Sequence, residues 1–396
     1  METKKLFYEN AYLREFDAKV VDICIEKNNL KVALDKTAFY PEGGGQACDT
    51  GIIKTGDKTF NVVDVHEKDG IIWHTLNSGD VDSFKVGSDI SGKINWERRF
   101  DQMQQHSGEH IVSGMICSHF NCDNIGFHVG SDAVIIDYNA KISLEEAKAI
   151  EAKANKYIWE NHAFEQLWPT PDKLKEIDYR SKKELTGAVR IARFPDADTC
   201  ACCGIHVKTS AEVGLVILVS AHPFHEGSRL ELYCGERALK YLLTVQQENK
   251  AISVLLSTKE HETSSATSKL LEENLKLKTE KVKIEDEYIN ILASTFEGKE
   301  NALIISEWIS PDMGRRLADE LANIVPGICA VFCKASDGEI FRYSIIKRDG
   351  DVSDFVKRMN QALEGKGGGR AGFAQGTLNA SKDEIENYFQ SESIML

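Results

Sequence analysis

One long stretch without helix breakers divides this chain of 396 residues. From Glu236 to about Ala293 the sequence has almost no glycine or proline, and its apolar residues recur at steps of three, four or seven. Because glycine and proline interrupt helices, this pattern predicts long helices. The polar segment Ser257–Ser268, rich in serine and threonine, predicts a break that divides them into two. We expect residues 236–295 to form a helical hairpin or coiled coil, either as a spacer or as the interface of a homodimer.

The segments on either side of these helices have different patterns. In residues 1–95, short apolar runs alternate with turn residues, which predicts a small β-barrel. Residues 96–235 mix helix and strand signals, including a helix over 100–120, and predict an α+β domain that carries the candidate metal ligands described below. Residues 296–396 alternate strands with helices and predict an α/β domain, so the predicted fold class is α+β multidomain. The predicted elements of this last domain are strands 302–306, 328–333 and 340–346 and helices 311–323 and 352–362.

Composition limits the class of protein and its compartment. Hydrophobic residues make up 42% of the chain and charged residues 28%, which is normal for a globular protein. No apolar run approaches the ~20 residues of a membrane span. The first residues also lack the apolar core of a secretory signal, so we expect a cytoplasmic protein without membrane contact. In that reducing compartment the ten cysteines are expected to be buried thiols or metal ligands rather than disulfides.

The net charge of −14 counts against a nucleic-acid partner. Asp and Glu number 62 and Lys and Arg 48, whereas phosphate binding requires a local surplus of basic side chains. We therefore expect any nucleic acid to bind along a local basic path, with the acidic residues concentrated away from it.

Two pairs of potential metal ligands have the same four-residue spacing. His106 and His110 lie four apart in a predicted helix, which places both imidazoles on one face. Cys202 and His206 flank a glycine that favours a turn. Three histidines and one cysteine suit zinc, a borderline-soft ion that is usually held by four N and S ligands in a tetrahedron. The two pairs predict one zinc ion per chain, although the spacing also allows Cys203 to replace Cys202.

The first pair also fits a different metalloenzyme pattern. Residues 106–110 match H-x-x-E-H, in which two histidines bind zinc and the glutamate is the base of a peptidase. That interpretation requires a further carboxylate ligand and leaves Cys202 and His206 unexplained. We therefore expect Glu109 to be a solvated helix residue and keep a zinc metallopeptidase as an alternative function.

A glycine triplet is the third candidate motif. Gly43, Gly44 and Gly45 stand between predicted strands, preceded by Thr37 and followed by Gln46. Glycine allows positive φ angles and a close approach of the backbone to a ligand. A tight turn also explains the triplet when it is taken alone.

These three motifs occur in the order found in the editing domain of alanyl-tRNA synthetase. The whole chain resembles the free-standing relatives of that domain, the AlaX-type alanyl-tRNA editing proteins. Residues 366–370, which read K-G-G-G-R and are followed by Ala374 and Gln375, resemble the DHHA1 domain that ends the synthetase. The resemblance therefore implies the long form of the family. One departure is the cysteine motif, which is Cys-Gly-Gly-Thr-His in the family and C-C-G-I-H at residues 202–206 here.

The resemblance implies an aminoacyl-tRNA deacylase acting in trans on the tRNA for alanine that carries serine or glycine. A synthetase site for alanine cannot strongly reject an amino acid with one extra hydroxyl. A second site that hydrogen-bonds this hydroxyl can discriminate, because alanine would leave a buried polar group unpaired. The resemblance assigns that hydrogen bond to Thr37.

The role of zinc in such an enzyme has two alternatives. Zinc can activate water or polarise a carbonyl, but four protein ligands close a tetrahedral site, as in structural sites. Either one of the four ligands gives way to water, or the zinc orders the pocket while Gln46 and the N–H groups of Gly43–Gly45 position the water.

The contacts to tRNA are the least specific part of the prediction. Lys366 and Arg370, in the glycine-rich loop, are candidate phosphate ligands because glycines let N–H groups converge on an anion. Arg98 and Arg99 are further candidates, although exposed arginines are common. A non-catalytic tRNA-binding module is the second alternative to the deacylase.

Overall fold

The computed structural model describes residues 2–26, 29–77, 80–130, 133–181, 187–335, 340–392 and 394. It divides the chain into two compact units, Met1–Ala251 and Ile252–Leu396. Within the described residues, no helix is long and apolar enough to cross a membrane.

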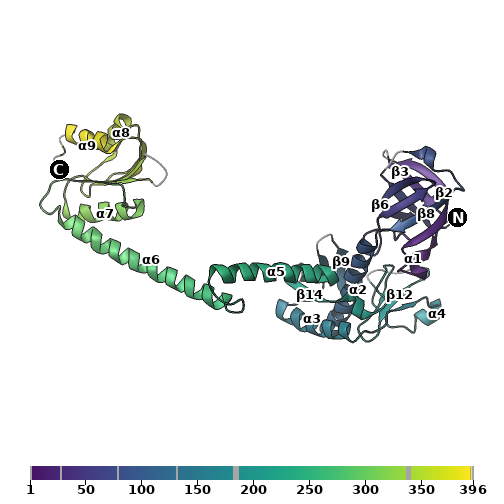
Figure 1. Cartoon of the computed structure of the whole chain (residues 1–396). Helices are drawn as coiled ribbons and strands as arrows, with labels where there is room; N and C mark the ends of the chain where they lie inside the picture. The colour runs from purple at the N-terminus through teal and green to yellow at the C-terminus, as the bar shows by residue number, and fades with distance from the viewer. Residues whose placement is uncertain are drawn as a thin grey trace. The chain divides into compact units, whose positions relative to one another are not determined.

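The first unit begins with the predicted β-barrel, which is closed and has six strands (Figure 1). Its inward-facing residues, such as Ala18, Phe60 and Ile90, are buried and alternate with exposed ones, as expected for strands around a small barrel core. In order around the barrel, the strands are β2 (Glu15–Glu26), β3 (Asn29–Leu34), β7 (Ile71–Leu76), β6 (Lys58–Lys68), β5 (Gly51–Thr55) and β8 (Asp89–Ile94). The short strands β1 (Lys4–Lys5) and β4 (Lys36–Thr37) pair in parallel beside it, and α1 (Leu6–Glu9) follows β1.

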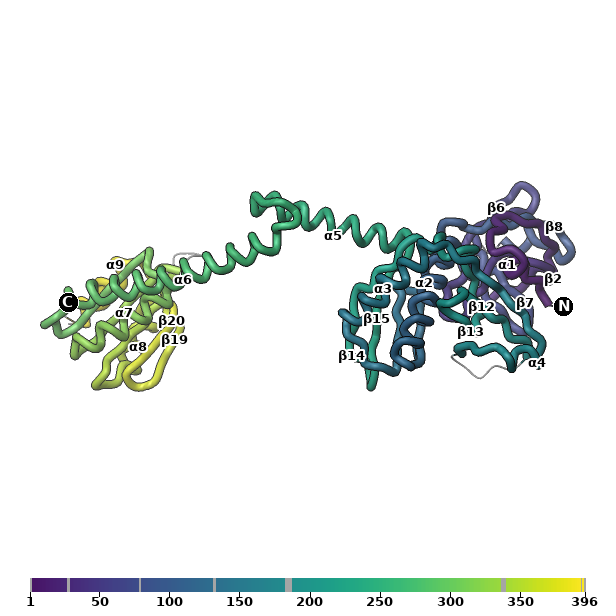
Figure 2. Tube along the Cα trace, turned by 90° about the horizontal axis from the view of Figure 1, so that it is seen from below, coloured from purple at the N-terminus to yellow at the C-terminus, as the bar shows by residue number. Residues whose placement is uncertain are grey.

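The rest of the first unit is α+β, as predicted. Helix α2 (Trp96–Phe120) leads from the barrel into a four-stranded antiparallel sheet, and Figure 2 shows α2 and α3 beside strands of this sheet. The sheet has the order β14 (Val216–Phe224), β15 (Gly227–Cys234), β10 (Val134–Tyr138) and β9 (Asn124–Val129), with α3 at Leu144–Trp159. A second, three-stranded sheet has the order β11 (Glu165–Leu167), β12 (Ile191–Phe194) and β13 (Asp198–Ala201), and α4 spans Pro171–Leu174.

Helix α2 is enclosed on all sides. The side chain of Asn95 caps its N-terminus by accepting a hydrogen bond from the N–H of Arg98, and Asn121 ends it in the left-handed conformation. Every residue from Gln102 to Gly114 is buried. This explains why its apolar residues follow a 3.6-residue period only loosely, since a helix without a solvent face needs no polar stripe.

The predicted break between two long helices is confirmed. Helix α5 spans Gly235–Leu255 and α6 spans Thr263–Ser294. The hairpin and the homodimer remain predictions.

The second unit contains an α/β domain in the segment where one is predicted. Its five-stranded sheet has α6 and α7 packed against one core and α8 and α9 against another. The sheet order is β16 (Ala302–Ser306), β17 (Cys329–Lys334), β18 (Phe341–Ile346), β20 (Phe373–Leu378) and β19 (Lys366–Arg370). The helices are α7 (Pro311–Ile324), α8 (Ser353–Ala362) and α9 (Lys382–Ser391).

The predicted loop at residues 366–370 is wrong. These residues form β19, which pairs with β20 at the edge of the sheet. Without side chains to direct outward or inward, the three glycines gave no alternating pattern that could indicate a strand. Lys366 and Arg370 are both exposed on this edge strand.

Candidate metal centre and adjoining cavity

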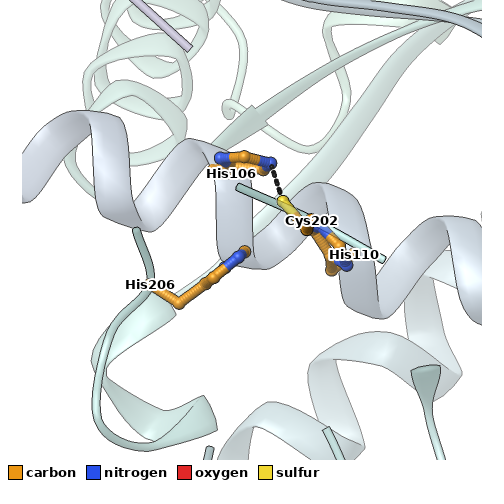
Figure 3. A group of neighbouring side chains, drawn as sticks. All are labelled: His106, His110, Cys202 and His206. Carbon is orange, nitrogen blue, oxygen red and sulfur yellow. Dashed lines mark hydrogen bonds between the residues drawn. The ribbon is translucent and has the colours of Figure 1, made fainter. Parts of the chain in front are cut away.

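The four predicted metal ligands converge on one point. The ligand atoms of His106, His110, Cys202 and His206 all lie within 4.8 Å of one another. The two histidines of α2 project from one face of the helix, and Cys202 and His206, which follow β13, face them (Figure 3). Cys203 is not part of the cluster, so the geometry favours Cys202 as the sulfur ligand.

Two of the histidines are oriented by a second polar group. His106 Nδ1 lies 2.8 Å from Gln46 Oε1, and this oxygen also accepts the N–H of Ile205 at 3.1 Å. His110 Nδ1 lies 2.7 Å from Asp198 Oδ2. Both partners are acceptors, so each Nδ1 carries the proton and each Nε2 presents a lone pair. This is the arrangement in which outer partners fix the tautomer of metal-binding histidines.

The third histidine carries an unsatisfied atom. His206 Nδ1 lies 3.2 Å from Ser107 Oγ, whereas Nε2 is buried and has no hydrogen-bond partner in the described part of the chain. A buried polar atom without a partner costs ~1–3 kcal/mol, so such an atom calls for a ligand. Three imidazoles and a thiolate within reach of one point fit a tetrahedral metal ion with N and S ligands.

The electrostatics of the cluster also favour a cation. Burial raises the pKa of Cys202, but the neighbouring His106 and His110 outweigh this effect and hold its pKa well below the ordinary value. Burial lowers the pKa of His110, yet the Cys202 thiolate and Asp198 raise it to about 10. The thiolate and the carboxylate therefore concentrate negative charge around His110, and a divalent cation would take the place of its proton.

The glycine triplet forms a tight turn against this cluster. The N–H of Gly43 donates to Gln46 O at 3.1 Å and the N–H of Gln46 donates to Gly43 O at 3.0 Å, with φ angles of 61° at Gly44 and 80° at Gly45. This is a two-residue hairpin turn of the type that requires positive φ at both central positions. A Cβ atom on Gly45 would lie 2.5 Å from the Phe127 ring. Positive φ and close approach thus apply to Gly44 and Gly45 but not to Gly43.

A cavity of about 710 Å³ opens beside the cluster. Its size lies within the ~300–1,000 Å³ typical of small-ligand sites. Its lining combines cluster residues with the turn and a set of aromatic and basic side chains, and no carboxylate is among the described lining residues. These include Lys5, Tyr8, Gly44, Gly45, His106, His110, Phe127, Trp168, Arg190, Cys202 and Cys203. Two carboxylates nevertheless lie beside the cluster, since Asp198 contacts His110 at 2.7 Å and Glu109 lies 4.0 Å from it. The expectation that the acidic residues are concentrated away from the site stays a prediction.

The departures from the family's cysteine motif have visible consequences. Cys203 replaces a glycine, and its sulfur lies 2.7 Å from where a Cβ of Gly44 would stand. Ile205 replaces a threonine and is buried in the hydrophobic core. Gly204 is retained, and a Cβ there would lie 2.0 Å from His106 Cε1. Only a glycine at this position lets the loop pass so close to a ligand ring.

Thr37 is not among the described residues that line the cavity. It is fully buried, and its Oγ1 lies 2.9 Å from His74 Nε2 and accepts the N–H of Phe39 at 3.1 Å. His74 Nδ1 lies 3.0 Å from the carbonyl of Val32, which requires a proton on Nδ1. Thr37 therefore donates its hydroxyl proton to His74 Nε2. Its role toward serine stays a prediction.

The expectation that Glu109 is solvated is wrong. Its side chain is buried, and Oε1 accepts hydrogen bonds from Ser113 Oγ and Asn124 Nδ2, both at 2.7 Å. Glu109 is also absent from the described cavity lining, so the geometry does not favour a peptidase base there. The error follows from the enclosure of α2, which leaves no solvent face for a polar residue.

Arg99, one of the two arginines predicted as candidate phosphate contacts, is buried. Its side chain is fully buried and forms an ion pair with Asp49, while Nη1 donates to the carbonyl of Ala11 at 2.8 Å. Its charge is neutralised inside the protein, so it is not exposed to meet phosphate. The adjacent Arg98 donates to the carbonyl of Cys48 at 3.1 Å.

Several residues around the site carry no motif in the sequence. Ser107 and Arg180 hold the outer atoms of the cluster, since Arg180 Nε donates to Asp198 Oδ1 at 2.8 Å. Tyr8, Trp168 and Arg190 line the cavity from segments distant in the sequence. Contacts of this kind depend on tertiary structure, so the sequence gives little sign of them. The one local signal is that Trp168 stands directly before a proline.

Comparison with known proteins agrees with this architecture. Residues 3–98, which contain the barrel, match the family described as tRNA synthetases class II (A). Residues 289–391 match the DHHA1 domain, as the resemblance implied. The chain thus combines a synthetase-type segment with a C-terminal DHHA1 domain.

The similarity to one editing protein covers almost the whole chain. The alanyl-tRNA editing protein AlaX-L of Pyrococcus horikoshii is 28% identical over an alignment of 395 positions that covers 96% of each protein. The resemblance to AlaX-type editing proteins is therefore confirmed. Alanine–tRNA ligases also match: that of Ignicoccus hospitalis is 32% identical over 65% of this chain and 28% of the ligase. That of Pyrococcus abyssi is 27% identical over 98% of this chain and 43% of the ligase, so this chain spans less than half of either ligase.

Proposed function

We propose that this protein is a zinc-dependent deacylase that hydrolyses seryl-tRNA, and also glycyl-tRNA, formed on the tRNA for alanine. The observation that carries the proposal is the set of four ligand atoms within 4.8 Å of one another, one of them without a partner, beside a cavity of about 710 Å³. The similarity to an alanyl-tRNA editing protein over 96% of both chains supports the same substrate class.

His106, His110, Cys202 and His206 would hold one zinc ion. When bound, zinc supplies Lewis acidity and a fixed positive charge at this end of the cavity. Four protein ligands favour an ion that orders the pocket. Gln46 acts as a positioning residue, because its Oε1 fixes both the tautomer of His106 and the N–H of Ile205.

The glycine turn supplies hydrogen-bond donors to the reacting ester. The N–H groups of Gly44 and Gly45 have no hydrogen-bond partner within the described residues, and both glycines line the cavity. The N–H of Gly43 donates to Gln46 O, so it is excluded from this role. In hydrolysis the water oxygen bonds to the ester carbonyl carbon, the bond to the ribose oxygen breaks, and a proton passes from the water to that oxygen. Preorganised N–H groups stabilise the negative charge that develops on the carbonyl oxygen.

Thr37 would act on serine selectivity from the barrel side. Because its hydroxyl proton is donated to His74, it could offer a serine hydroxyl only its remaining lone pair. Lys366 and Arg370, exposed on β19, would contact tRNA phosphate away from the reacting end. The helices α5 and α6 are the proposed dimer contact, and the cytoplasm is the proposed compartment.

Deacylation of three substrates tests the proposal. The purified protein is incubated with seryl-, glycyl- and alanyl-tRNA, all charged on the tRNA for alanine, with and without a chelator. We expect loss of the seryl and glycyl esters, a stable alanyl ester, and inhibition by the chelator that added zinc reverses.

Two results would contradict the proposal. If the seryl ester is stable under all conditions, the protein is not a deacylase and a tRNA-binding module is the remaining alternative. Full activity with the metal removed would exclude a role for zinc. Replacement of Thr37 by valine should reduce the difference between the hydrolysis rates of the seryl and alanyl esters. Thr37→Ser should preserve this difference.

A further inference from the structure

The cavity contains a buried positive charge that pairs with no carboxylate of the described residues. Arg190 is only 6% exposed and lines the cavity. Its Nη1 donates to the carbonyls of Cys202 at 2.8 Å and Gly204 at 2.6 Å, and its Nε donates to Gln166 Oε1 at 2.9 Å. Nη2 has no partner within the described residues. A buried guanidinium held only by neutral groups is expected to bind an anion, because burial of an uncompensated charge is costly.

The lysine of the lining differs from Arg190. Lys5 Nζ lies 2.7 Å from Glu67 Oε1, so its charge is already paired. Apart from the histidines of the metal-ligand cluster, Arg190 is therefore the basic group of the described lining that an incoming anion would neutralise. Arginine is well suited to phosphate because its planar donors can bind two oxygens at once.

An exposed aromatic side chain stands next to Arg190. In the antiparallel pair of β11 and β12, Leu167 lies opposite Ile191. Trp168 follows Leu167 and Arg190 precedes Ile191, so these two residues lie side by side at the end of the pair. Trp168 is 52% exposed, and its ring meets the ring of Tyr8 at 73° with a centroid separation of 5.7 Å. The Arg190 guanidinium lies 5.1 Å from the centroid of the same Tyr8 ring. Trp168 is thus accessible at the edge of the cavity, next to the Arg190 guanidinium, whose Nη2 has no partner among the described residues.

Hydrogen bonds connect the residues of this corner in the absence of a ligand. Gln166 accepts from Arg190 through Oε1 and donates through Nε2 to the carbonyl of Tyr8 at 3.1 Å. The Tyr8 hydroxyl donates to the carbonyl of Cys203 at 2.7 Å. Tyr8, the guanidinium and the loop that carries Cys202 are therefore joined by hydrogen bonds, and Trp168 packs against Tyr8. Groups that are already held in place lose little conformational entropy on binding.

We propose that Trp168 and Arg190 form the subsite for the terminal nucleotide of a single-stranded RNA 3′ end. The base stacks on Trp168, and the phosphate on the 5′ side of that nucleotide binds Arg190 Nη2. The ester on its ribose then faces Cys202 and the glycine turn. This inference deepens the proposed function, since it assigns the nucleotide of the aminoacyl ester to named residues.

Binding of a non-reactive probe separates the two contacts. The trinucleotide CCA, adenosine 5′-monophosphate and adenosine are titrated against the full chain, and binding is followed by calorimetry at several salt concentrations. Trp168→Ala should weaken all three ligands by about tenfold, because loss of one base–aromatic stack has roughly this effect. Trp168→Phe should retain most of the affinity.

The replacement Arg190→Gln should have a different signature. It should weaken the binding of CCA and of the monophosphate and leave the affinity for adenosine unchanged. It should also reduce the slope of log K against log salt by about 0.7, the value for one phosphate contact on a single strand. Arg190→Lys should keep part of the slope. The metal content of each variant shows whether the loop of Cys202 remains intact.

Two residues of the same unit serve as controls. Trp159 is 70% exposed on α3, and Arg193 pairs with Glu165 on the same sheet; neither lines the cavity. Trp159→Ala and Arg193→Gln should bind all three ligands like the wild type. The inference is overturned if Trp168→Ala and Arg190→Gln also bind like the wild type, or if Arg190→Gln weakens adenosine as much as the monophosphate.

The outcome is distinguishable from failure of the proposed function. If the wild type binds CCA as described but leaves seryl-tRNA intact, the subsite stands and the deacylase fails. If the wild type hydrolyses seryl-tRNA and the two variants match it in KM and in CCA affinity, the deacylase stands and this subsite fails.

Discussion

Two groups of buried polar side chains in the first unit differ in how completely they are satisfied. On the barrel side, His74 bonds to Val32 and Thr37 through its two ring nitrogens, and Arg99 pairs with Asp49. In the metal-ligand cluster, His206 Nε2 and the adjacent Gln46 Nε2 are buried without a partner among the described residues. The first group completes its hydrogen bonds within the protein, and the second leaves these two atoms without a partner in the described part of the chain.

The contrast explains why a buried histidine alone says little about function. His74 is as deeply buried as His206, yet both of its ring nitrogens have hydrogen-bond partners. What distinguishes the cluster is that the outer nitrogen of each histidine is held while the inner atoms face one another. A candidate metal site is thus recognised by several ligand atoms that face one another while outer partners hold the same side chains.

The largest expected effect is on the barrel side. Arg99→Met would leave Asp49 buried without its partner, and removal of one member of a buried ion pair costs ~3–5 kcal/mol of unfolding free energy. Chemical denaturation measures this loss. As a control, Lys93→Met breaks the exposed pair with Glu15 and should have no measurable effect. Equal stability of the two variants would contradict the assignment of Arg99 as a buried structural residue.

The next effect is a pH dependence that originates at His74. Burial lowers the pKa of His74 to about 4, from 6.5 in the unfolded chain. Between these values the unfolded chain takes up a proton that the folded chain does not, so stability falls as the pH falls, by ~1.4 kcal/mol per pH unit for this group. The loss begins near pH 6.5 and levels off below about pH 4. His74→Gln should have a correspondingly flatter stability profile; an unchanged profile would show that His74 is not the source.

In the cluster, the outer partner of His110 should control metal affinity. Asp198→Asn replaces the carboxylate that holds His110 Nδ1, and loss of such a partner typically weakens metal binding by about 10–100-fold. Competition with a chromophoric chelator measures the affinity. Asp172→Asn, on the exposed α4, is the matched control and should bind metal like the wild type. Wild-type affinity in both variants would argue against metal binding through His110.

The smallest of these effects separates the three glycines. Gly45→Ala places a side chain at positive φ against Phe127 and should lower the free energy of unfolding by ~1–2 kcal/mol. It should also reduce the deacylase activity. Gly43→Ala should be nearly neutral, because the nearest atom to its Cβ is 3.5 Å away and its φ is not positive. Thermal unfolding and deacylation rates of both variants are compared. Equal losses would mean that the triplet acts through something other than the turn.

Local sequence patterns predicted the parts of this protein that depend on local structure. The four-residue spacings in 106–110 and 202–206 identified the residues that the fold brings together, because such spacing places side chains on one face of a helix or across a turn. Strands β5 and β8 were not predicted individually, since both are short and include glycine and exposed lysine.

What could not be predicted depends on distant parts of the chain. The burial of Glu109 follows from the enclosure of α2 by other elements, which no local period reveals. The hydrogen bond between Gln46 and His106 joins residues 60 positions apart. The pairing of Trp168 with Arg190 requires the register of two strands separated by a long connection.

The metal content of three proteins tests the central claim most directly. Wild type, Cys202→Ala and Cys203→Ala are stripped with a chelator, reloaded with zinc and desalted, and bound zinc per chain is measured. We expect one equivalent in the wild type and in Cys203→Ala, and much less in Cys202→Ala. A wild type that takes up no zinc, or a Cys202→Ala variant that retains a full equivalent, would contradict the account.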